Sequence, residues 1–249
     1  MGEFINGIQD YFGASRLIWR NHLWRWLIIP GFISLLYFPA VLWFCWMFAD
    51  DSARYLQENW LPAWINHPVI AWALVLPVWI GLLYYGFTVY RNLIMIIYSP
   101  VLGIVSERTE QHLTHIDPAA RPKVAVWKGM LRGIKMSLTS LALSALALVV
   151  CVAMLLIPIV GGLLMAICLP LSQMFLAGQG FMDPMLERKS YGVRGSLKFC
   201  WSNRMRTIGC GAGFTLLTMI PIVGWFVAPG FGIVAGTRSA VHLVDHKFN

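Results

Sequence analysis

The side chains of this 249-residue chain best suited to chemistry are two pairs of histidines. His112 and His115 stand three residues apart beside Glu110, and His242 and His246 stand four residues apart. Such spacing can present ligands to a metal ion on one face of a helix. The sequence holds no HExxH motif, Gly-x-Ser-x-Gly motif or P-loop. We therefore expect no resident metal or other cofactor, and no enzymatic activity.

Positive charge at the edge of apolar sequence is a second feature. Arg25 lies near the start of a long apolar run, and Arg91 and Asn92 interrupt apolar sequence between Tyr90 and Tyr98. A charge in such a place is a functional hypothesis by default. The alternatives are that Arg25 is a topology anchor whose side chain reaches the interface, and that Arg91 marks the end of a helix.

The composition indicates whether these residues belong to a soluble protein or to a membrane protein. Of the sequence, 58% is hydrophobic and 12% is charged, about half the charge of a soluble domain. One soluble core of this size cannot bury so much apolar surface, so we predict an integral membrane protein. The net charge of +8 then predicts contact with anionic lipid head groups rather than with nucleic acid. The five cysteines show no CxxC spacing and are predicted to be small buried hydrophobes.

Apolar periodicity predicts the elements of the first half. Residues 4–19 have the three-and-four spacing of an amphipathic helix lying at the membrane interface. Two long apolar runs, 23–49 and 69–98, predict spanning helices, because about 20 residues cross a bilayer. The segment 50–68 between them holds one of the 19 Lys and Arg residues, so it is predicted to be external. Both termini are then cytoplasmic.

The second half contains an internal repeat. IPIVG occurs at 157–161 and at 220–224, each time between two apolar runs, which predicts membrane-inserted hairpins over 137–182 and 209–243. The arms of the second hairpin, 12 and 14 residues, reach only about 20 Å of a core about 30 Å thick. The first hairpin has longer arms. We expect one membrane domain over residues 1–249.

Two further segments combine a basic stripe with an apolar stripe. One covers 127–138 and the other covers 193–201. Each spacing predicts an amphipathic helix lying on the membrane surface.

Four segments of the chain carry a resemblance to a known family. They are FTLLTMIPIVGWFVAPGFGIVAGTR at 214–238, SPVLGIVSERTE at 99–110, RWLIIP at 25–30 and FMDPMLER at 181–188. In that order they resemble the last hairpin, the Pro-x-x-Gly-x-x-x-Glu-x-x-Glu turn, the proline-punctuated start of the first spanning helix and the segment between the two hairpins of one family. That family is the CysZ-type sulfate permeases and their etoposide-induced relatives in eukaryotes.

The resemblance implies a fold and a function. The fold is an all-α membrane protein with two long transmembrane helices, two hemi-penetrating helical hairpins and interfacial helices, assembled as a homo-oligomer. The function is transport of sulfate or a related oxyanion across the bacterial inner membrane for cysteine synthesis. The alternatives are a membrane organiser that transports nothing and, further off, a membrane enzyme.

The resemblance also implies an anion-binding site. Arg25 would supply charge-assisted hydrogen bonds, the turn at Gly103 would supply backbone N–H groups, and Arg20 would add positive charge. Trp24 and Leu102, beside these residues, complete the predicted anion-binding set. The sequence departs from the family at three places: the pair of arginines at the first helix is Trp24-Arg25 here, the polar residue before the glycine is Leu102, and Asp183 is followed directly by Pro184.

Two carboxylates follow that turn. Glu107 and Glu110 lie three residues apart on one helical face and cannot themselves bind an anion. We predict that they pair with Arg108, Lys128 or Arg132 and stabilise the fold. The alternative is that one of them titrates and couples protons to transport.

Overall fold

The computed structural model describes residues 2–60, 83–86, 88, 89, 92, 99–114, 126–154 and 160–245. All the elements in these residues are α-helices, which confirms the all-helical class. In chain order they are α1 (Gly2–Arg20), α2 (Trp24–Trp60), α4 (Ser99–Thr114), α5 (Val126–Met154), α6 (Val160–Arg188), α7 (Val193–Ser202), α8 (Arg204–Thr218) and α9 (Val223–Asp245). Most of the predicted span 69–98 lies outside the described residues.

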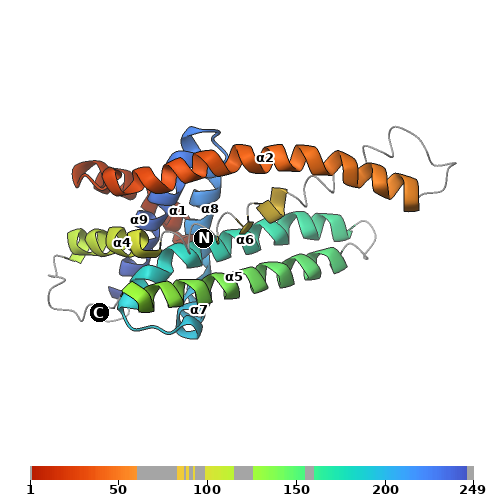
Figure 1. Cartoon of the computed structure of the whole chain (residues 1–249). Helices are drawn as coiled ribbons and strands as arrows, with labels where there is room; N and C mark the ends of the chain where they lie inside the picture. Colours follow the sequence, from red (N-terminus) through yellow and green to blue (C-terminus); the bar gives the residue numbers. More distant parts are fainter. Residues whose placement is uncertain are drawn as a thin grey trace.

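The helices form two regions (Figure 1). Helices α2, α5 and α6 run lengthwise along the molecule, and α1, α4, α7, α8 and α9 gather towards one end of it. We call that end, with the last turns of α6, the head. Among the described residues, the helices long and apolar enough to cross a membrane are Leu131–Met154 of α5, with 24 residues, and Gly161–Arg188 of α6, with 28. Both belong to the predicted hairpin 137–182, whose depth of insertion stays a prediction.

Two predicted segments lie within longer helices. The helix that contains the predicted span 23–49 continues to Trp60, so residues 50–60 of the predicted connector are helical. Charges at Asp50, Arg54 and Glu58 are spaced by four residues, which favours a helix. The predicted surface helix at 127–138 is not separate either, because it forms the first part of α5. The other one is separate, since α7 is a helix of 10 residues.

In the region of the predicted second hairpin, α8 and α9 are two helices joined at the second IPIVG copy, and insertion of this pair into a membrane stays a prediction. Ile222 turns the chain there with φ of 62°, and Met219 and Val223 are 73% and 63% exposed. The second arm is longer than predicted, because α9 begins at Val223 and contains Pro229 within it. Proline is compatible with helical φ and removes only one backbone hydrogen bond.

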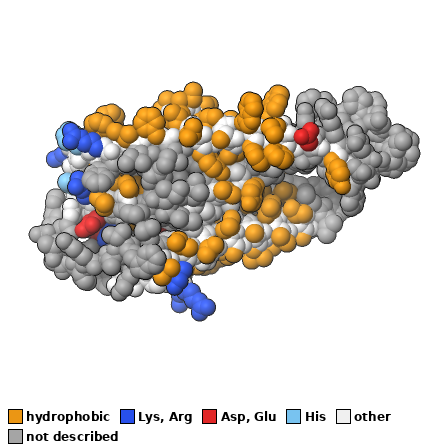
Figure 2. Space-filling view, in the orientation of Figure 1, with side chains coloured by type: hydrophobic (Ala, Val, Ile, Leu, Met, Phe, Trp, Pro, Cys, Tyr) orange, Lys and Arg blue, Asp and Glu red, His pale blue; other side chains and the backbone are white. Residues whose placement is uncertain are grey.

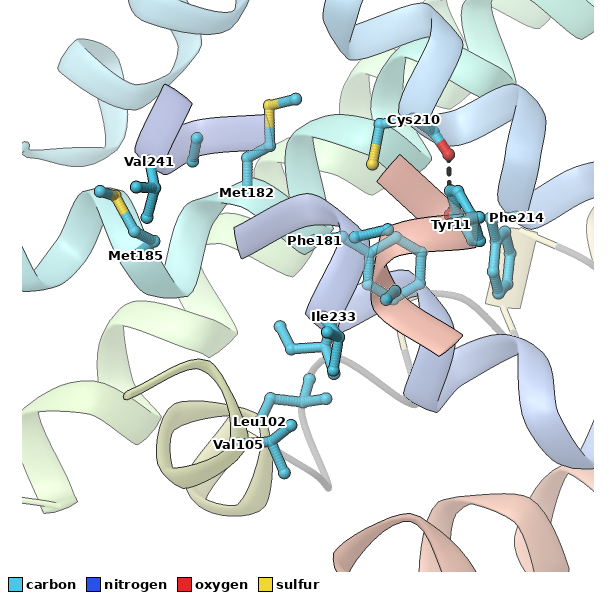
Figure 3. Packing of buried hydrophobic residues seen from close by; sticks show 14 of the residues in the cluster. Tyr11, Leu102, Val105, Phe181, Met182, Met185, Cys210, Phe214, Ile233 and Val241 are labelled. Carbon is cyan, nitrogen blue, oxygen red and sulfur yellow. Dashed lines mark hydrogen bonds between the residues drawn. The ribbon is translucent and has the colours of Figure 1, made fainter. Parts of the chain in front are cut away.

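The hydrophobic core lies in the head (Figure 3). Phe181 of α6 packs on Phe214 of α8 with ring centroids 4.8 Å apart, and Leu102 of α4 lies near Ile233 of α9. The Tyr11 hydroxyl of α1 donates a hydrogen bond to the carbonyl oxygen of Cys210, 2.8 Å away. Contacts between helices far apart in sequence therefore close the head around one core.

Helix α1 has apolar residues on two faces. Tyr11 and Ala14 are buried in the core. Ile5, Phe12 and Trp19 recur every seven residues and are 51%, 75% and 71% exposed. The predicted helix is confirmed, but part of its apolar face packs on protein. The outer row is available to lipid, so its interfacial position stays a prediction.

Candidate functional site

Three of the predicted anion-binding residues lie at the corner between α1 and α2. His22 turns the chain there with φ of 52°, and Leu23 beside it is 1% exposed and fixes the corner to the core. Arg20 and Arg25 are both exposed. The Arg25 Cζ atom lies 5.8 Å from the centroid of the Trp24 ring, which is a cation–π contact. Arg20, Trp24 and Arg25 thus present a cationic, aromatic corner to the outside.

The other two predicted residues lie inside a helix. The segment expected to turn at Gly103 forms the first turns of α4. As the fifth residue of α4, Gly103 uses its N–H within the helix and does not form a turn. Leu102 is 2% exposed in the core and offers no side-chain ligand. No hydrogen bond or ion pair joins Arg25 to α4 among the described residues, so a shared site stays a prediction.

Glu110 has partners other than the predicted ones. It is 3% exposed, and its Oε2 atom lies 3.0 Å from Nη2 of Arg188, while Oε1 lies 3.5 Å from Nζ of Lys189. Arg188 also donates to Ser106 Oγ at 2.9 Å. Glu110 therefore ties α4 to the end of α6, which fits the predicted stabilising role. Glu107 forms no ion pair within the described part of the chain.

Arg132 forms a second ionic cluster between α5 and α6. Its Nη2 atom lies 2.8 Å from Oδ1 of Asp183 and donates to Ser196 Oγ of α7 at 2.9 Å. Its Nε atom lies 3.9 Å from Oε2 of Glu187. The Arg132 side chain, which is 14% exposed, thus forms its ion pair with Asp183 and not with the predicted partners Glu107 and Glu110 of α4.

Asp10 is the centre of a third ionic cluster. Its carboxylate accepts hydrogen bonds from Arg206 Nη2 at 2.8 Å, from Arg238 Nε at 3.0 Å and from the Ser239 hydroxyl. The side chains of Asp10 and Arg206 are 5% and 8% exposed. Arg206 reaches the exposed Glu3 as well, at 3.2 Å. This cluster fixes α1 to both helices of the second hairpin.

Sequence reasoning missed the Asp10 cluster. Asp10 stands on the predicted polar face of α1 and looks like an ordinary surface carboxylate. Its partners, Arg206 and Arg238, are 196 and 228 residues away, so no local spacing could have paired them. Asn92, noted from the sequence, is 7% exposed, and its Nδ2 atom donates to the Thr88 carbonyl oxygen at 2.8 Å.

Charge and apolar surface separate on the outside of the molecule. Figure 2 shows hydrophobic side chains over the long helices and Lys, Arg and His side chains gathered at the head end and along one edge. Within the described residues, no group of three or more His, Cys, Asp and Glu side chains could hold a metal ion. His115 and His246, from the two predicted pairs, lie outside those residues.

The family model of the sulfate transporter CysZ and etoposide-induced protein 2.4 matches residues 11–229. The chain belongs to this family. No curated protein matches the sequence. Together with the two apolar helices α5 and α6, membership makes the chain a membrane protein of a family that includes sulfate transporters.

Proposed function

We propose that this protein transports sulfate or a related oxyanion across the bacterial inner membrane and so feeds cysteine synthesis. The observation that carries the proposal is the family match over residues 11–229, which covers most of the chain. The two apolar helices of the first hairpin supply the membrane-crossing part. We propose that the protein acts without a cofactor and as a homo-oligomer.

The site that we propose for the anion is the cationic corner of Arg20, Trp24 and Arg25. An exposed guanidinium group can donate two parallel hydrogen bonds to an oxyanion. Arg25 makes no ion pair among the described residues, whereas Arg132, Arg188 and Arg206 are paired with carboxylates. The helix N-terminus before Gly103 is the proposed second part of the site, because its free N–H groups favour anions.

The orientation that we propose places both termini, and the basic surface at the head end, on the cytoplasmic side. The Arg238–Asp10 ion pair holds the C-terminal helix α9 against the N-terminal helix α1, so these two helices belong on one side. The positive charge at the head end also favours that side and anionic lipid head groups.

Uptake of labelled sulfate into proteoliposomes tests the proposal. The wild-type protein is expected to exceed empty liposomes, and Arg25→Ala is expected to reduce uptake about tenfold, because charge-assisted hydrogen bonds are lost. Arg25→Lys should keep part of the uptake. Arg194→Ala is the matched control, since Arg194 is an exposed cation on α7 and should leave uptake unchanged.

A membrane organiser is the second candidate. The exposed row of Ile5, Phe12 and Trp19 on α1 favours it, because such a row can bind lipid or another membrane protein. Wild-type uptake no greater than that of empty liposomes would support this candidate and end the transporter proposal.

A further inference from the structure

A row of buried polar side chains runs between the first hairpin and the described helical residues 83–86, 88, 89 and 92, which we call the 83–92 segment. On α5, Ser137, Ser140 and Ser144 are spaced by three and four residues and are 4%, 8% and 2% exposed. Thr88, Asn92 and, on α6, Gln173 are 3%, 7% and 6% exposed. We call these six residues the polar seam. The spacing places the three serines on one face of α5, and Thr88 and Asn92 on one face of the 83–92 segment.

Hydrogen bonds across the polar seam join all three segments. Gln173 Nε2 donates to the Tyr84 hydroxyl at 2.6 Å, and Tyr84 donates to the carbonyl oxygen of Ser144 at 3.3 Å. Ser137 Oγ lies 3.5 Å from the carbonyl oxygen of Asn92. Side-chain and backbone groups of 83–92, α5 and α6 therefore meet along one line inside the apolar part of the molecule.

The line begins at the head. Arg132 of α5 pairs with Asp183 of α6, and one helical turn further along each helix Met136 contacts Gln179. Gln179 is 1% exposed, and its Oε1 atom accepts no hydrogen bond within the described residues. A buried amide oxygen of this kind is normally satisfied by water or an ion. It marks the head end of the polar seam as a place where water binds.

The charges at this end of the polar seam cancel. Three cations and three carboxylates form the ion pairs there: Arg132, Arg188 and Lys189 with Glu110, Asp183 and Glu187. Beyond them, the six described residues of the polar seam carry hydroxyl and amide groups, so an ion that enters the seam meets neutral hydrogen-bond donors from these residues.

The outer face of α5 has the opposite character. Leu138, Leu146 and Val149 are 59%, 58% and 65% exposed, which suits contact with lipid tails. A membrane hairpin that is apolar outside and polar inside is typical of helices that line a path for water or ions. A structural role alone does not account for the unsatisfied Gln179 oxygen.

We propose that the polar seam is a hydrated path along which the oxyanion crosses the apolar layer. This inference rests on the proposed function and adds the route. Successive hydroxyl and amide donors, about 5.4 Å apart where they lie one turn apart, replace part of the hydration shell of the anion. Because they carry no fixed charge, they hold the anion weakly enough to release it.

Cysteine labelling in proteoliposomes tests the route. The five native cysteines are replaced, and Ser140→Cys, Ser144→Cys and Leu146→Cys are added one at a time. A membrane-impermeant, negatively charged methanethiosulfonate reacts only where water allows a thiolate to form. We expect modification of Ser140→Cys and Ser144→Cys to be at least about tenfold faster than that of Leu146→Cys, which lies at a similar depth and faces outwards. Sulfate should slow the two fast reactions, and modification should block uptake.

The outcomes separate the route from the transport activity. Normal sulfate uptake with equally slow modification of all three variants would overturn the route and leave the proposed function intact. Fast modification of Ser140→Cys in a protein that takes up no sulfate would overturn both, since the seam would then carry water alone. Ser137→Cys replaces either seam variant that does not give a monodisperse protein.

Discussion

The two hairpins of this protein share the IPIVG repeat and are held in place by different interactions. The α8–α9 hairpin is packed in the head, where Asp10 pairs with Arg206 and Arg238 from its two helices. The α5–α6 hairpin has an apolar outer face and polar side chains inside, of which Ser144 and Gln173 are 2% and 6% exposed. The two hairpins therefore share a short motif but differ in what surrounds their helices: ion pairs with α1 for α8–α9, and buried polar groups inside an apolar outer face for α5–α6.

The largest expected effect comes from the backbone contact between the two hairpins. A Cβ atom at Gly211 of α8 would lie 1.6 Å from the carbonyl oxygen of Met174 on α6, and a helix backbone cannot yield by that much. Gly211→Ala should therefore destabilise the protein by more than about 4 kcal/mol and abolish folded material. Gly162→Ala on α6 is the control, because no atom lies within 4 Å of its Cβ position. Size-exclusion profiles and melting temperatures check both, and a wild-type Tm for Gly211→Ala would contradict the contact.

The next effect concerns the ionic cluster at Asp10. Asp10→Asn leaves Arg206 buried with a weaker partner and should cost about 3–5 kcal/mol of unfolding free energy. Glu3→Gln also removes a carboxylate that pairs with Arg206, but the Glu3 side chain is 55% exposed, so the cost should stay below about 1 kcal/mol. Thermal unfolding in detergent and proteolysis of α1 measure the difference. Equal melting temperatures for the two variants would mean that the cluster does not hold α1.

A change in the polar seam should lower transport strongly and stability little, unlike the changes at Gly211 and Asp10. Gln173→Leu removes hydrogen bonds between α6 and residues 83–92, and such bonds in membranes contribute only about 0.6 kcal/mol on average. The melting temperature should change little, whereas sulfate uptake should fall at least about tenfold if the path needs that donor. A large loss of Tm with normal uptake per folded protein would assign the polar seam to stability instead.

The smallest effect is a pH dependence in the head. Burial raises the pKa of the Cys200 thiol well above its ordinary value of 9.0, and burial likewise raises the pKa of the Tyr11 hydroxyl. A group whose pKa is raised by folding stabilises the protein fully below the unfolded pKa and less as pH rises towards the folded pKa. Tm should thus be constant from about pH 6 to 8 and fall above about pH 9. Cys200→Ala should reduce that fall, and an identical fall in the variant would contradict the assignment.

Which segments are helical could be predicted from the sequence better than the residues at which each helix begins and ends. Apolar runs and the IPIVG repeat predicted the helical class and both hairpin regions, because these depend on local periodicity. The predicted turn at Gly103 was wrong, because Gly103 lies within α4, and the second arm of the second hairpin is longer than the 14 residues predicted, because packing can outweigh the local cost of glycine and proline in a helix. The head supports α9 through Ala228 and Ile233, both 0% exposed.

The predicted site was harder to infer than the helices. Arg20, Trp24 and Arg25 are on the surface, as their positions at the edge of apolar sequence suggest. Leu102 is in the core instead, because α4 packs that face on α9. Glu110 pairs with Arg188 and Lys189, which are 78 and 79 residues further along the chain, and no helical spacing predicts such partners.

The sequence by itself determined that this is a cationic, helical membrane protein of this family, since composition, periodicity and motifs are local properties. The tertiary structure decided which charged side chains form ion pairs and which polar groups are buried. Asp10 meets Arg206 and Arg238, and serines from one apolar helix face Asn92 and Gln173 from two others, only because separate helices pack together. Burial and ion pairing are properties of these contacts, and they separate a structural charge from an available one.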